Sequence, residues 1–183
     1  MSNRPKREED QQSPHKAQLL PRPTTSAGRS HELEFILAWV ALSSDAPDSD
    51  AMDTSGLVAC CGAKLVHVLD TQPLAFTARG LSSLEPTAMK LWCGGCPMAD
   101  GFVAEHVRVL RDLGSWLERD CGGLFANAIT ASKGRLAGRG GLLARLARTE
   151  AYSNPRGARV QRLFRTLDTL QLFSAVDPET LRL

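Results

Sequence analysis

The segment from Gly101 to Cys121 places the tightest limit on the fold, because its pattern fits an amphipathic helix. Apolar side chains recur along it every three or four residues, the spacing that lines one face of a helix. These are Val103, Val107, Leu110, Leu113 and Leu117, with Phe102, Val109 and Trp116 widening the stripe. Asp100 is predicted to be the N-cap, and Gly122-Gly123 is predicted to end the helix. A stripe this wide predicts that two neighbouring elements cover the helix.

Five further segments are predicted to be helical. Each has helical apolar spacing or a start signal, and they run from Leu57 to Leu69, Leu84 to Trp92, Leu124 to Ile129, Leu142 to Tyr152, and onward from Pro155. Ser82 or Ser83 is predicted to cap the second of these. Proline suits the first position of the last one, since it has no N–H to leave unbonded there. The run from Phe35 to Leu42 is continuously apolar, which fits either a buried strand or a short helix. We therefore predict a mostly α fold with one short strand element.

The chain of 183 residues is long enough for one domain with a core, and 43% of its residues are hydrophobic. Residues 1–30 are polar and rich in proline, so we predict a disordered tail there and a helical domain over residues 31–183. No apolar stretch is long enough to span a bilayer, and the N-terminal residues lack a secretory signal. We expect an intracellular, cytoplasmic protein without a membrane partner. The cysteines number five, which favours reduced thiols over a disulfide framework.

Positive charge is concentrated in the C-terminal third of the chain. Nine basic residues and one acid, Glu150, lie between Thr130 and Thr166, so this segment carries +8 while the whole chain carries +2. Such a segment can attract the phosphate of a nucleotide or of a nucleic acid. The segment lacks the regular interleaving of aromatic residues among its arginines that base stacking would need, which favours an ordinary solvated face and gives no expectation of direct tRNA binding.

Two short motifs are similar to cofactor-binding motifs, but the residues around them do not support a cofactor. Cys93-x-x-Cys96 has no second ligand pair for zinc, and it follows a predicted helix where a thioredoxin-like motif would follow a strand. Gly138-Arg139-Gly140-Gly141 has no strand before it and no Lys-Ser/Thr after it, so a linker is favoured over a phosphate-binding loop. We predict neither a metal nor a cofactor.

The stretch from Glu105 to Ile129 resembles the central segment of the queuosine 5′-phosphate N-glycosylase (queuosine salvage) family. The family pattern is an E-R-x-R-x-L-x-x-x-G helix followed by Gly-Gly-x-Phe-x-Asn. The matching residues are Glu105, Arg108, Leu110, Gly114, Leu117, Gly122, Gly123, Phe125 and Asn127. Flanking pieces follow in family order, among them Thr54 to Gly56, Pro73 to Thr77, Leu84 to Trp92 and Gly157 to Val160, with Phe35 to Trp39 at the place of a family strand. The resemblance covers about residues 31–172.

The resemblance implies a fold similar to the helical DNA glycosylases and hydrolysis of the N-glycosidic bond of queuosine 5′-phosphate, which releases queuine for tRNA modification. That reaction needs a carboxylate beside an oxocarbenium-like sugar centre. The position of the family's active-site lysine is Phe164 here, and no Ala-Asp-Tyr-Arg segment with the catalytic aspartate is found in the 183 residues. We therefore assign no catalytic residue.

The resemblance gives His31, Trp39 and Arg165 as candidate pocket residues, by their nearness to family motif positions. The expected partner is the small molecule queuosine 5′-phosphate or queuine. Two other functions stay open, namely a non-catalytic nucleotide-binding protein and a basic helical nucleic-acid-binding protein. The oligomeric state is not predicted.

Overall fold

The computed structural model describes residues 31–43, 52–94 and 100–170, and within these ranges every regular element is helical. The α-helices are α2 (Glu32–Ala41), α3 (Met52–Thr71), α4 (Ala78–Ser82), α5 (Pro86–Trp92), α6 (Asp100–Cys121), α7 (Phe125–Ala131), α8 (Leu142–Leu146) and α9 (Ala158–Thr169). Two 3-10 helices, η1 (Pro73–Phe76) and η2 (Glu150–Tyr152), join them. The mostly α prediction is confirmed. The predicted tail, residues 1–30, lies outside the described residues.

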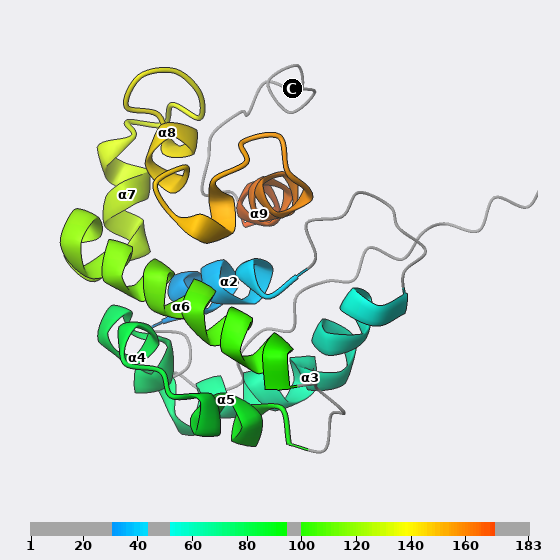
Figure 1. Ribbon diagram of the computed structural model, residues 1–183. Coiled ribbons are helices and arrows are strands. Elements are labelled where there is room, and N and C mark those ends of the chain that lie inside the picture. Colours follow the sequence, from blue (N-terminus) through cyan, green and yellow to red (C-terminus); the bar gives the residue numbers. More distant parts are fainter. Residues whose placement is uncertain (1–30, 44–51, 95–99, 171–183) are drawn as a thin grey trace, which may run out of the picture.

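Helix α2 lies at the centre of the molecule, between α6 and α9 (Figure 1). It packs against α6, α7, α9 and η1, and all residues from Glu34 to Ala41 are buried. A helix that is covered on all sides is apolar on all sides, so it shows no helical periodicity. The strand element predicted at Phe35 to Trp39 is therefore wrong, because the same continuous apolar run belongs to an enclosed helix.

The long helix α6 packs most closely on α4, through a glycine (Figure 1). A Cβ atom added to Gly114 would lie 2.3 Å from the Ser82 nitrogen and 2.6 Å from the Ala78 oxygen. Both are backbone atoms of α4, so the two helix backbones touch where Gly114 has no side chain. Of the apolar positions predicted for this helix, seven are described and buried, namely Val103, Val107, Val109, Leu110, Leu113, Trp116 and Leu117. Helix α6 contacts α2, α4, α5, α7 and η2. It therefore has more neighbours than the two predicted.

Aromatic rings join α2 to the α3–α5 part of the fold. Phe76, in η1, packs edge-on against Phe35 with ring centroids 4.9 Å apart, and it lies 5.3 Å from Trp92 of α5. The capping prediction for α5 is wrong: Ser82 and Ser83 end α4 and donate to the Arg79 carbonyl, whereas Glu85 precedes α5 without a side-chain cap. Thr77 is the residue that caps a helix here, since its hydroxyl accepts the Gly80 N–H of α4.

The C-terminal third divides into shorter elements than the sequence predicted. The helix expected from Leu142 to Tyr152 is interrupted between α8 and η2, where Thr149 is buried and its hydroxyl bonds to the Leu146 carbonyl. The helix expected to start at Pro155 starts at Ala158 instead, after an N-cap at Gly157. The side chains of Val160, Leu163, Phe164 and Leu167 form its buried face, and Leu170 after the helix is half-buried.

Candidate functional site

The double glycine forms a tight turn between α6 and α7, built from residues of the family-like motif. Gly122 and Gly123 have φ of 59° and 88°, which side-chain-bearing residues rarely adopt. The Gly123 N–H donates to the Leu117 carbonyl at 2.9 Å. Asn127 then reaches back, and its Nδ2 donates to the Cys121 carbonyl at 2.8 Å. The motif glycines and asparagine thus satisfy the free carbonyls at the end of α6.

A buried carboxylate fixes α7 onto the central helix. Glu34 is only 3% exposed, and its Oε1 accepts the Phe125 N–H, at the first residue of α7, over 2.8 Å. A carboxylate is favoured at this position, because the first N–H groups of a helix lack partners within the helix. Glu34 therefore ties α2 to the turn that holds the double glycine. The sign of this contact in the sequence is an acid, Glu34, directly before the apolar run that begins at Phe35.

The three predicted pocket residues are not brought together. Trp39 is a core residue, 8% exposed, whose ring packs on Phe35 at 5.5 Å and against Gly62 of α3. His31 precedes α2 and is half-buried, with its Nδ1 enclosed and without a hydrogen-bond partner. Arg165 lies on α9 with an exposed side chain. Trp39 is thus placed for packing, which leaves His31 and Arg165 as residues with unused polar groups.

Phe164, which the resemblance aligns with the family's lysine, is part of the core. Its side chain is 3% exposed on the buried face of α9, together with Leu163 and Leu167. A lysine ammonium in this position would lose its hydration, which is costly without a paired charge. The local surroundings of Phe164 are therefore those of a packing residue.

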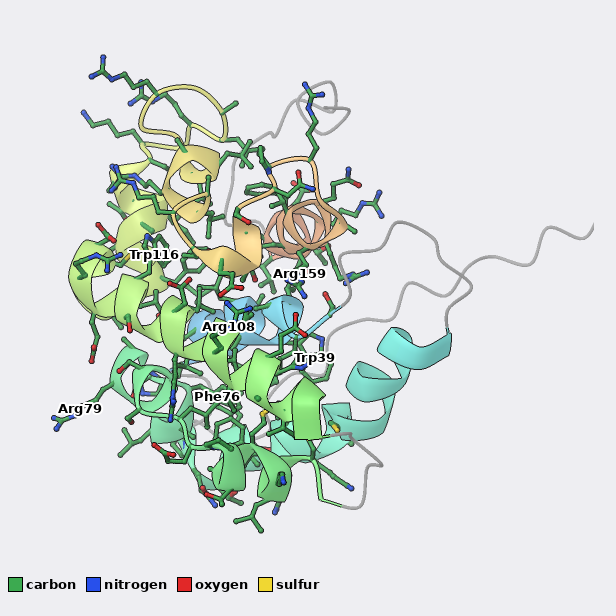
Figure 2. All side chains as sticks on the ribbon, in the orientation of Figure 1. Trp39, Phe76, Arg79, Arg108, Trp116 and Arg159 are labelled. Atoms are coloured by element: carbon green, nitrogen blue, oxygen red, sulfur yellow. The ribbon has the colours of Figure 1, made fainter. Side chains whose placement is uncertain are left out.

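Polar side chains from the C-terminal third of the chain form hydrogen bonds with α2 and with Ser43, which follows it. The Tyr152 hydroxyl donates to the Leu37 carbonyl at 2.6 Å, and burial raises the pKa of Tyr152 far above its ordinary value. Arg159 Nε donates to the Ser43 carbonyl at 2.7 Å, and Arg162 donates to the Ser43 hydroxyl. Figure 2 shows Arg159 where α9 meets α2. These residues, which the sequence did not single out, place cations at the C-terminal end of a helix, where its dipole favours them.

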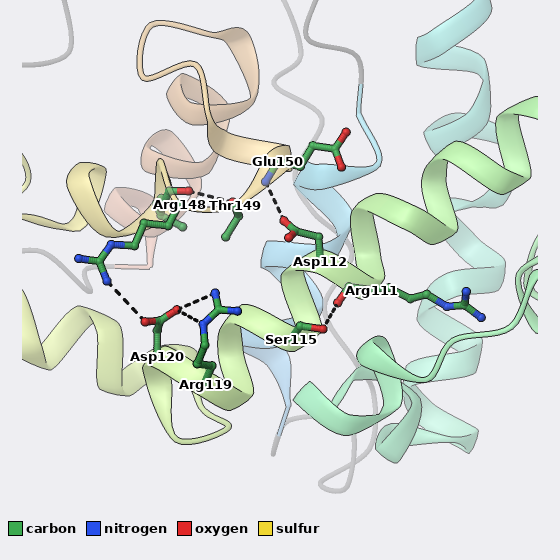
Figure 3. A network of polar contacts seen from close by, with 9 residues as sticks. Arg111, Asp112, Ser115, Arg119, Asp120, Arg148, Thr149 and Glu150 are labelled. Atoms are coloured by element: carbon green, nitrogen blue, oxygen red, sulfur yellow. Dashed lines mark hydrogen bonds and ion pairs between the residues drawn. The ribbon is translucent and has the colours of Figure 1, made fainter.

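A surface network connects α6 to α8 and η2 (Figure 3). Asp112 Oδ2 accepts the Glu150 N–H at 2.7 Å, while Asp120 pairs with Arg119 at 3.0 Å and with Arg148 at 3.4 Å. Arg108, a residue of the family-like motif, pairs with Glu150. Exposed pairs of this kind contribute little to stability individually. Their effect is to orient the α8–η2 segment along α6.

The thiols of Cys61, Cys93 and Cys121 are buried. Burial raises the pKa of Cys93 to about 12, with a further contribution from the adjacent Cys61 thiol. Burial also raises the pKa of Cys121 to about 11. Within residues 31–43, 52–94 and 100–170, no cluster of three or more His, Cys, Asp or Glu side chains is arranged to hold a metal ion. No helix among the described residues combines the length and apolar character needed to cross a membrane.

Comparison with known proteins adds no relative to this picture. The chain matches no protein-family model, no curated protein and no solved structure. The resemblance to the queuosine salvage family, and the likeness to helical DNA glycosylases that it implies, stay predictions.

Proposed function

We propose that this protein acts on queuosine 5′-phosphate and hydrolyses its N-glycosidic bond to release queuine. The observation that supports this best is the α6–turn–α7 unit. Each glycine of the motif has a position where a side chain is unfavourable: Gly114 against the α4 backbone, and Gly122 and Gly123 at positive φ. Asn127 bonds to the end of α6. When one backbone arrangement requires each residue of a motif, proteins that carry the motif are expected to share that arrangement. The resemblance makes the same assumption.

The reaction is tested with the purified chain and queuosine 5′-phosphate, following free queuine by mass spectrometry. We expect queuine to accumulate with time and with protein concentration, and guanosine 5′-monophosphate to stay intact. Absence of queuine at protein concentrations equal to the substrate would contradict hydrolysis.

Arg165 is the proposed contact for the 5′-phosphate, because its guanidinium is exposed and has no acidic partner among the described residues. Removing a charge-assisted hydrogen bond costs about 1.5–3 kcal/mol, so Arg165→Ala is expected to weaken binding roughly 10- to 100-fold. Arg156→Ala is the matched control, since Arg156 is also exposed but precedes α9. Equal effects of the two substitutions on affinity would remove Arg165 from the site.

Binding without hydrolysis is the second candidate function, and Phe164 favours it. The position that carries the family's lysine holds a core phenylalanine here, 3% exposed. A protein without that ammonium keeps a scaffold for the nucleotide but loses a polar group of the active site. Calorimetry separates the two functions: heat of binding with no queuine formed would support the second, and neither heat nor queuine would exclude both.

A further inference from the structure

The loop between α7 and α8, residues 132–141, carries cations that the fold does not use. Lys133, Arg135 and Arg139 are exposed, and none of them has an acidic partner in the part of the chain that the structure describes. No acid occurs in the sequence between Ser132 and Arg148. Figure 1 shows this loop standing out from the helical body, and Figure 2 shows long nitrogen-tipped side chains extending from it.

The loop has a defined backbone, which fixes the positions from which these cationic side chains extend. Leu136 is buried beneath it, and the Leu142 and Leu143 N–H groups donate back to the Arg135 and Leu136 carbonyls, both at 3.0 Å. Gly141 packs against its other side, where an added Cβ would lie 2.5 Å from the Ala137 oxygen. A loop that is ordered before binding loses less conformational entropy when a ligand binds.

Two neighbouring arginines, Arg145 and Arg148, have structural roles in this region. Arg145 donates to the Ala131 and Gly140 carbonyls at 3.3 and 3.4 Å, and Arg148 pairs with Asp120 at 3.4 Å. In contrast, Arg135 Nη2 would lie 3.7 Å from a Cβ on Gly140, which brings its guanidinium next to the residue that follows Arg139. Lys133, Arg135 and Arg139 lie on one short loop without an acid, so their charges add to a positive potential that attracts an anion.

We propose that loop 132–141 binds the phosphodiester backbone of a nucleic acid without regard to sequence. Arginine guanidinium groups match phosphate oxygens in a two-point geometry. The loop sequence, Ser-Lys-Gly-Arg-Leu-Ala-Gly-Arg-Gly-Gly, has no aromatic residue for base stacking, and its one large apolar side chain, Leu136, points inward. Backbone phosphates are therefore its target, and insertion into a lipid surface has no side chain to support it. The sequence alone left a basic nucleic-acid-binding protein open as an alternative, but it could not locate the site, because it could not distinguish paired from unpaired arginines.

The test measures affinity of the full chain for a labelled tRNA transcript and for a single-stranded RNA between roughly 50 and 200 mM salt. Three contacting cations predict a slope of log affinity against log salt of roughly −2 to −3. The double substitution R135A/R139A removes two of the three contacts, so we expect the slope to flatten by about 2.

The control is R79A/R156A, which also removes two exposed arginines that have no acidic partner among the described residues. Arg79 points away from the molecule on α4, far along the chain from the loop (Figure 2). We expect this control to leave the slope nearly unchanged. Equal flattening by both double variants would reduce the effect to net charge and overturn the proposal. A flat response of the unmodified protein would overturn it too, as would binding to phosphatidylserine vesicles that exceeds binding to RNA. Release of queuine from the free nucleotide is a separate readout, so either proposal can fail without the other.

Discussion

At the scale of single residues, Gly114 is one of the positions where the fold leaves no room for a side chain. The atoms that an added methyl group would meet are backbone atoms of α4, at 2.3 to 2.8 Å, and backbone atoms cannot turn aside as a flexible side chain can. Gly123 differs from it in kind, because its φ is 88° but no atom lies within 4 Å of its added Cβ. Gly114 is required because a side chain would collide with α4, and Gly123 is required because a side chain disfavours its backbone conformation.

We expect Gly114→Ala to lower the free energy of unfolding by about 3 kcal/mol or more, at the upper end for an overpacked site. Gly123→Ala should cost about 1–2 kcal/mol, the strain of a left-handed alanine. Urea unfolding of both variants checks the order. If Gly123→Ala proves the more harmful, the close α4–α6 contact is not what Gly114 provides.

At the scale of elements, α7 depends on a residue far from it in sequence. Ninety-one residues separate Glu34 from Phe125, yet the carboxylate of the first accepts the N–H of the second. With only seven residues, α7 is too short to be stable by itself. Glu34 and the buried contacts of Phe125 and Ala128 hold it in place.

Glu34→Ala leaves a buried N–H group without an acceptor, and we expect a loss of about 1–3 kcal/mol in unfolding free energy. Glu34→Gln is the matched variant, since its amide oxygen can still accept the bond, and it should lose less. Hydrogen exchange at the Phe125 amide reports the same contact locally and should speed up in the alanine variant. Unchanged exchange there would mean that another group caps α7.

The periodicity of apolar residues identified the helices that have one solvent-exposed face, and it failed for the elements that have none. The stripe of α6 was predicted because the opposite side of that helix is polar. The enclosed helix α2 has no such contrast, and the break between α8 and η2 depends on Thr149 bonding to a nearby carbonyl. The partners of Glu34 and Tyr152 lie 91 and 115 residues away, and no local pattern reveals contacts over such distances. Trp39 was a pocket candidate by its nearness to family motif positions, and only its contacts with Phe35 and Gly62 mark it as a core residue.

At the scale of the whole molecule, the buried thiols and the buried tyrosine make the free energy of unfolding depend on pH in the alkaline range. Folding raises the pKa of the Cys93 thiol from 9.0 to about 12 and that of Cys121 from 9.0 to about 11. The pKa of Tyr152 rises as well, with burial as the main cause. In each case the native state keeps a proton that the unfolded chain releases as the pH rises.

Unfolding free energy is therefore expected to be insensitive to these thiols below pH 9.0, and to fall as the pH rises from there toward about 12. Urea midpoints of the native protein and of C93A/C121A, measured on both sides of pH 9.0, test this. The double variant should lose less stability on the alkaline side. Parallel curves for the two proteins would show that the thiols do not contribute to the dependence.

The enclosure of α2 has a consequence for how the protein is made. The tyrosine that bonds to α2, Tyr152, is translated 115 residues after Leu37. At a synthesis rate of ~5–20 residues per second, the apolar segment of α2 is therefore without this partner for on the order of ten seconds. During that interval it is an exposed apolar segment of the kind that chaperones bind, so we expect the yield of this protein in cells to depend on what protects α2 during translation.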